Sequence, residues 1–133
     1  MGVQAEWYKQ FVESSGSSIQ TGTIKHPLKT SDDGIVTAAI QVKTHSGTDS
    51  FTFQIRYYYR NLSHLDGNDV FSDWFDLVNY AGNNQITNVG TDGKVFVSRI
   101  TDQPEFDQCD GFEIKVTRSS GTGLTVNIQI MGR

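Results

Sequence analysis

The sequence predicts an all-β fold, a single antiparallel β-sandwich of seven to eight strands with an N-terminal arm. Apolar and polar residues alternate with a period of two over most of the chain, which is typical of strands with one buried face. Breaks rich in glycine, serine, aspartate and asparagine recur about every 10–20 residues, the rhythm of a sandwich or barrel. Jelly-roll and immunoglobulin-like topologies produce the same alternation, so both stay open.

The clearest strands are residues 36–42 and 51–59, where valine, isoleucine or aromatic side chains share one face and mostly threonine, glutamine, lysine or arginine the other. Residues 112–118 and 124–131 alternate in the same way. A glycine-containing connection of five residues, 119–123, joins these last two, so they are predicted to form a hairpin. The other predicted strands are residues 71–77, residues 95–100 and, more weakly, residues 18–24.

The first 18 residues differ from the sandwich domain, which is predicted to span residues 19–133. Trp7, Tyr8, Phe11 and Val12 recur with the spacing of an amphipathic helix, so residues 4–13 are predicted to be a short helix or an extended arm. These four side chains are candidate interface residues. The arm either docks on a neighbouring subunit or folds back over its own sandwich. Deletion of residues 1–15 is expected to leave a folded sandwich.

Composition limits the possible partners. The 133 residues carry a net charge of −4 and are 11% aromatic, which favours one folded domain over disorder. An isoelectric point near 5.2 lacks the basic surplus that nucleic acid requires, and no apolar stretch is long enough for a membrane helix. The start of the chain does not resemble a signal peptide, and Cys109 is the only cysteine. We therefore expect assembly in a reducing cytoplasm.

The sequence predicts no enzyme. It has no Gly-x-Ser-x-Gly elbow, phosphate loop or dinucleotide fingerprint. His26, His45 and His64 lack zinc-site spacing, and the acidic loops at 66–69 and 102–110 resemble calcium loops in composition alone. No catalytic residue, metal or cofactor is therefore predicted. A small hydrolase stays as a third alternative, because the separation of two carboxylates depends on tertiary structure.

Aromatic residues give the best binding signal. Tyr58 must face away from Tyr57 and Tyr59 in an extended strand, and Trp74 likewise faces away from its aromatic neighbours. With Arg56 and Arg60, they form a possible binding face. Such side chains can lie in a covered core, fill a protein interface or stack on sugar rings.

Two runs resemble small β-sandwich virion proteins of tailed bacteriophages: FTFQIRYYYR (51–60) followed by FSDWFDL (71–77), and DGFEIKVTR (110–118) followed by LTVNIQI (124–130). The resemblance covers residues 34–131. It implies a non-enzymatic virion protein, most directly a capsid decoration (cement) protein that binds the major capsid protein and stabilises neighbouring subunits. It also implies a homo-oligomer, with a trimer favoured. The alternative is a carbohydrate- or receptor-binding module of a tail or fibre.

Overall fold

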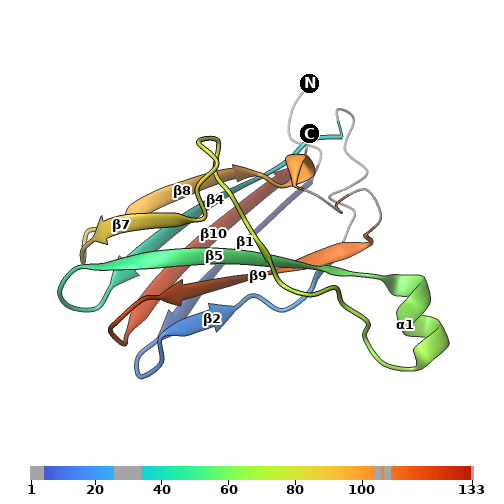
Figure 1. Cartoon of the computed structure of the whole chain (residues 1–133), viewed down its shortest axis with the longest axis horizontal. Coiled ribbons are helices and arrows are strands. Elements are labelled where there is room, and N and C mark those ends of the chain that lie inside the picture. Colours follow the sequence, from blue (N-terminus) through green and yellow to red (C-terminus); the bar gives the residue numbers. More distant parts are fainter. Residues whose placement is uncertain (1–4, 26–33, 104–105, 107–108, 133) are drawn as a thin grey trace.

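Two antiparallel sheets face each other in the computed structural model of the chain, which describes residues 5–25, 34–103, 106 and 109–132 (Figure 1). The four-stranded sheet has the order β1 (Ala5–Glu13), β10 (Leu124–Gly132), β4 (Val36–Thr44) and β8 (Lys94–Arg99). The six-stranded sheet has the order β2 (Ser18–Gln20), β9 (Gly111–Arg118), β5 (Asp49–Tyr58) and β6 (Phe75–Asp76), with β3 (Ile24–Lys25) also on β9 and β7 (Gln85–Val89) also on β5. The predicted all-β sandwich is confirmed. The ten strands in the described part of the chain exceed the seven to eight expected. Residues 5–13 were predicted as a helix or arm but form β1, and the short strands β3 and β7 carry too little alternation to be read from sequence.

The strand order is that of a jelly roll. The first and last strands of the chain, β1 and β10, pair with each other, and β10 pairs with β4, which pairs with β8. In the facing sheet β9 lies between β2 and β5. An immunoglobulin sandwich instead pairs its first strand with the second and its last strand with the one before it.

The core lies between the two sheets. Val36, Ala38, Ile40 and Val42 are buried on the inner face of β4, as their alternation predicts. In the facing sheet, β5 buries its own alternate residues, and the rings of Phe53 and Phe96 stack across the gap with centroids 3.8 Å apart. The inner face of the sandwich was therefore readable from the period of two.

The N-terminal segment is a strand and not a helix. Residues 5–13 form β1, which pairs with all of β10 at the edge of the four-stranded sheet. Trp7 and Phe11 pack against the core, while Tyr8 and Val12 are 75% and 60% exposed on the other face. A stripe of four aromatic and apolar residues fits a short helix and an edge strand equally well, and pairing with β10 decides between them. Deletion of residues 1–15 would remove this edge strand, so we expect the deletion to destabilise the sandwich.

Two other expectations fail. Residues 71–77 are strand only at β6, and the preceding chain forms a short helix, α1 (Arg60–Asp66), that ends at Gly67 in the left-handed conformation. The hairpin predicted from 112–118 and 124–131 does not exist, since β9 and β10 belong to different sheets. The residues between them cross from one sheet to the other.

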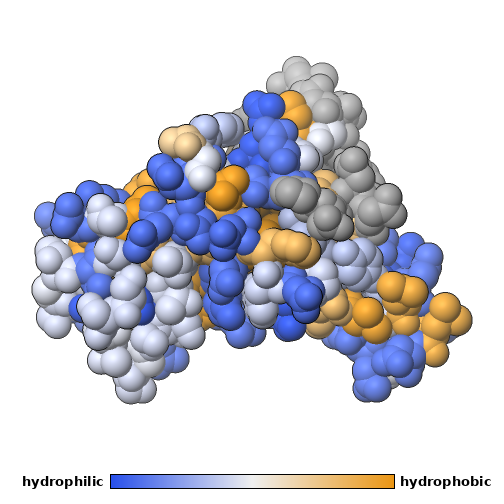
Figure 2. Space-filling model, viewed as in Figure 1, coloured by the Kyte–Doolittle hydropathy of each residue, from blue (hydrophilic) through white to orange (hydrophobic). Residues whose placement is uncertain are grey.

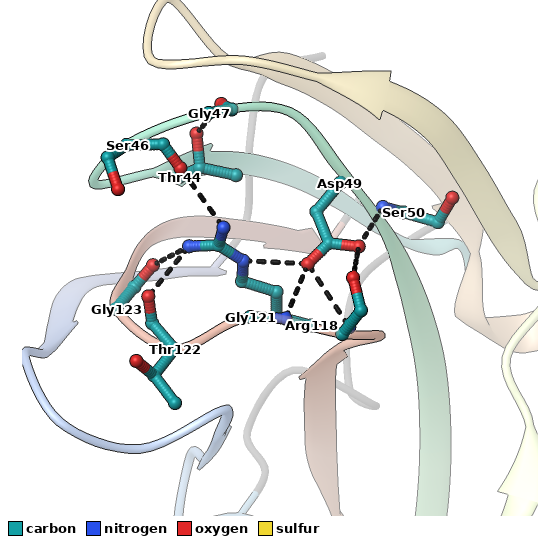
Figure 3. Close-up of polar contacts among 10 residues, drawn as sticks. Thr44, Ser46, Gly47, Asp49, Ser50, Arg118, Gly121, Thr122 and Gly123 are labelled. Atoms are coloured by element: carbon teal, nitrogen blue, oxygen red, sulfur yellow. Dashed lines mark hydrogen bonds and ion pairs between the residues drawn. The ribbon is translucent and has the colours of Figure 1, made fainter.

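An ion pair organises this crossing (Figure 3). The Arg118 Nε donates to Asp49 Oδ2 at 2.8 Å, and both side chains are less than a tenth exposed. The Arg118 guanidinium also donates to the carbonyl oxygens of Ser46, Thr122 and Gly123. A side chain at Gly121 would place its Cβ 2.7 Å from Arg118 Cζ, so a larger residue there would displace the guanidinium from its hydrogen bonds.

The Asp49 carboxylate is saturated with hydrogen bonds. Burial alone raises the pKa of this carboxyl, but donation from Arg118 and from the backbone N–H groups of Ser50, Gly121 and Ser120 outweighs burial. The pKa of Asp49 is held well below its ordinary value of 3.8. The charged form is therefore the one that the folded state stabilises.

Replacing Asp49 by alanine is expected to lower the free energy of unfolding by about 3–5 kcal/mol at neutral pH, because Arg118 stays buried without its counter-ion. A carboxyl whose pKa is depressed by folding contributes its stability above the unfolded pKa and loses it as pH falls toward the folded value. The difference between the natural chain and Asp49→Ala should therefore shrink below about pH 4. Urea unfolding at a series of pH values measures it.

The matched control is Asp73→Ala, since Asp73 is exposed. This change should alter the free energy of unfolding by no more than about 0.5 kcal/mol. Equal effects of the two substitutions at neutral pH would show that the buried pair does not stabilise the fold.

Candidate functional site

The predicted binding residues Arg56 and Trp74 meet on the outer face of the six-stranded sheet. Arg56 Nε donates to Glu113 Oε1 at 2.6 Å, and its Cζ lies 3.9 Å from the ring centroid of Phe71 and 4.8 Å from that of Trp74. Lys115 Nζ lies 4.5 Å from the Trp74 ring. Trp74 is half-buried, and cations of the same chain already contact its ring.

Tyr58 and Arg60 lie farther along the same side. Tyr58 is 6% exposed, with Lys25 Nζ 5.0 Å from its ring centroid. Arg60 begins α1, and its backbone N–H donates to Asp110 Oδ2. A hollow of about 170 Å³ is lined by Lys25, Tyr58, Arg60 and Asp110. The structure thus brings Arg56 and Trp74 together in a clamp, formed by Arg56, Lys115, Phe71 and Trp74, that leaves little open aromatic surface. Tyr58 packs on Phe71 of this clamp, and Arg60 is exposed at the start of α1.

The opposite outer face, on the four-stranded sheet, is open. Register places Gln10 of β1 beside Asn127 of β10, Gln41 of β4 and Val95 of β8 in one row. The adjacent row contains Tyr8, Gln129, Ala39 and Val97. These eight residues are here called the amide face.

Hydrogen bonds join the three amides of the first row. Gln10 Nε2 donates to Asn127 Oδ1 at 2.8 Å, and Asn127 Nδ2 donates to Gln41 Oε1 at 2.9 Å. The bonds hold the amide groups in fixed orientations across three strands. Each amide keeps hydrogen-bonding capacity for a ligand, because a primary amide has two N–H donors and two acceptor lone pairs.

The amide face is hollowed and uncharged. All its residues except Val97 line a depression of about 480 Å³, together with Lys9 and Ile128. Tyr8 stands at the β1 side and Val95, 56% exposed, at the β8 side. None of the eight side chains is charged at neutral pH. Such a surface can hold a neutral, hydroxyl-rich ligand.

The sequence predicts Tyr8 as an interface residue of an arm, and Gln41, Asn127 and Gln129 as residues on the polar faces of strands. The sequence alone could not predict that these amides lie side by side, because residues 10, 41 and 127 become neighbours only through the register of three strands. The alternation itself was the usable signal: it placed all three amides on outward faces.

In the described part of the chain we also looked for a metal site, a reactive cysteine and a membrane-spanning helix. Within it, no three histidine, cysteine, aspartate or glutamate residues lie close enough to hold a metal ion, although His26, Glu105 and Asp107 fall outside that part. Cys109 is buried, with its thiol donating to the Phe106 carbonyl. No helix in the described ranges is both long enough and apolar enough to span a bilayer.

No protein-family model and no curated protein matches the chain. Among solved structures, the chain is similar to the N-terminal part of xylanase 10B from Clostridium thermocellum, which holds CBM22-1 and GH10 modules complexed with xylohexaose (TM-score 0.52, 9% identity, 95% of this chain and 28% of that one). Two further similarities are to the SPBc2 prophage-derived protein YomS (TM-score 0.49, 11% identity, 98% and 97% covered) and to the CBM22-1 xylan-binding domain of Paenibacillus barcinonensis Xyn10C (TM-score 0.47, 12% identity, 96% and 85% covered). At these identities the likeness is one of fold, a β-sandwich.

Arg56→Ala is expected to lower the free energy of unfolding by about 1.5–3 kcal/mol, because Glu113 loses its charged partner. It should also shift the fluorescence emission of Trp74 to longer wavelength, because the ring becomes more exposed to water. A Trp7→Phe background isolates that emission, since the chain has two tryptophans. Arg60→Ala, which removes an exposed arginine, is the control. An unchanged emission and stability would contradict the clamp.

Proposed function

We propose that the chain is a non-enzymatic carbohydrate-binding β-sandwich module whose site is the amide face. The observation that carries the proposal is an exposed tyrosine ring beside three hydrogen-bonded amides on one hollowed face whose own eight side chains are uncharged. Sugars present apolar C–H faces that stack on aromatic rings, and hydroxyl groups that both donate and accept. Amide groups can both donate hydrogen bonds to sugar hydroxyls and accept hydrogen bonds from them.

The fold is compatible with this function, because it is shared with a xylanase chain that includes a CBM22-1 module and was solved with xylohexaose. A sandwich hosts many functions, however, so the proposal depends on the site and not on the fold. The clamp on the other sheet offers a poorer platform, since cations of the chain itself contact its aromatic rings.

Tyr8→Ala is expected to weaken binding of the best glycan about fivefold, because a stacked aromatic ring contributes on the order of 1 kcal/mol. A glycan array identifies the ligand, and titration calorimetry measures the change. Tyr80→Ala removes another exposed tyrosine, 63% exposed and outside the amide face, and should leave affinity unchanged. An array without any ligand would refute the proposal.

The second candidate is the capsid decoration protein that the virion resemblance implies, with the major capsid protein as partner. The observation that favours it is exposed apolar surface at two ends of the molecule. Val12 of the predicted interface segment is 60% exposed on an edge strand, and Leu62 and Leu65 are 52% and 82% exposed on α1, where Figure 2 shows apolar side chains gathered. Exposed apolar clusters often mark protein interfaces.

A decoration protein of this kind is expected to form a trimer, in solution or at high concentration, through one of these surfaces. Light scattering on a sizing column measures the mass of the natural chain, Val12→Lys and Leu65→Lys. A trimer dissociated by one of the substitutions supports the candidate and locates its interface. A monomer at every concentration counts against the self-association that it requires.

A further inference from the structure

We propose that the amide face binds a neutral, linear polysaccharide that lies across the strands, along the row of Gln10, Asn127 and Gln41. This inference rests on the proposed carbohydrate function and adds the direction, the length and the charge class of the ligand. Three features carry it: the direction of the amide row, the hydrogen-bonding groups left free at its two ends, and the position of the charges around the face.

The amide row fixes the direction. Its two hydrogen bonds link β1 to β10 and β10 to β4, so the row runs perpendicular to the strands. Neighbouring strands lie about 4.8 Å apart, so the four strands from β1 to β8 span roughly 14 Å. A pyranose unit in an extended chain advances by a length similar to the spacing of two neighbouring strands. A chain laid across the sheet would therefore place about one sugar over each strand.

The two ends of the row differ chemically. Gln10 donates and Gln41 accepts, so within the described residues the Gln10 Oε1 and the Gln41 Nε2 have no hydrogen-bond partner. A chain of hydrogen bonds polarises its members, which strengthens the terminal acceptor and the terminal donor. The row thus offers an acceptor for a sugar hydroxyl over β1 and a donor to a sugar oxygen over β4.

The shape of the face agrees with this path. Ala39, in the row beside the amides, is the smallest side chain of the face, and it lies between Gln129 and Val97. The surface therefore dips over β4, while Tyr8 rises at one edge and Val95 at the other. A flat, unbranched chain fits such a shallow depression better than a branched one.

Charges lie outside the two rows of the amide face. Glu6 and Arg99 flank it in one direction along the strands, and Lys43 flanks it in the other. Lys9 borders the hollow, but its Nζ lies 5.1 Å from the Phe11 ring centroid. No cation belongs to either row of the amide face, so a carboxylate or sulfate on the ligand would lose water without gaining a counter-ion within the two rows.

Calorimetric titration with neutral β-1,4-linked oligosaccharides of two to six units, and with galacturonate oligomers of the same lengths, tests the inference. The Kd of the neutral series should fall about threefold or more for each unit up to three or four, then change little. The galacturonate series should bind at least roughly tenfold more weakly at low salt. Gln41→Leu should weaken the binding of the tetramer about tenfold, whereas Gln54→Leu, on the outer face of the other sheet, should not.

The outcomes separate this inference from the function on which it rests. Equal affinity for disaccharide and hexasaccharide, equal affinity for the acidic series, or an unaffected Gln41→Leu variant would overturn the inference while glycan binding stands. Failure of every glycan on the array to bind the folded chain would overturn the proposed function itself.

Discussion

The buried pair of Asp49 and Arg118 is the interaction on which the architecture depends. Four connections cross between the sheets at one end of the sandwich, and Arg118 bonds to three of them: those from β1 to β2, from β4 to β5 and from β9 to β10 (Figure 1). The Arg118 guanidinium donates to the Ser46 carbonyl, between β4 and β5, and to the Gly123 carbonyl, between β9 and β10. The Arg118 backbone N–H donates to the Ser17 carbonyl, between β1 and β2. Because each donor is matched by an acceptor, the charge is tolerated away from water.

This closure explains how a surface can be assembled from distant segments. In the closed sandwich β10 lies between β1 and β4, so the start, middle and end of the chain are neighbours on one face. The register of these three strands then aligns the amides of Gln10, Asn127 and Gln41. A slip of one residue in any strand would turn its amide inward.

The two outer faces of the sandwich have taken different roles. On the six-stranded sheet, Arg56 is held between Glu113 and two aromatic rings, so the polar and aromatic groups satisfy one another. On the four-stranded sheet, the amides bond only in a row and keep capacity toward solvent. A surface whose groups are internally paired supports the fold, whereas one with free donors and acceptors is available to a ligand.

The sequence by itself determined the fold class and the side of each long strand that faces the core. That information is local, because alternation along β4 and β5 records burial residue by residue. It also placed Gln41, Asn127 and Gln129 outward. The tertiary structure decided what each strand pairs with. Ala5–Glu13 became an edge strand, and β9 and β10 were placed in different sheets, which gives the jelly-roll order. The Trp74 ring came to lie against two cations. These outcomes depend on contacts between residues far apart in the chain, such as Asp49 with Arg118, and a periodic pattern carries no information about such partners.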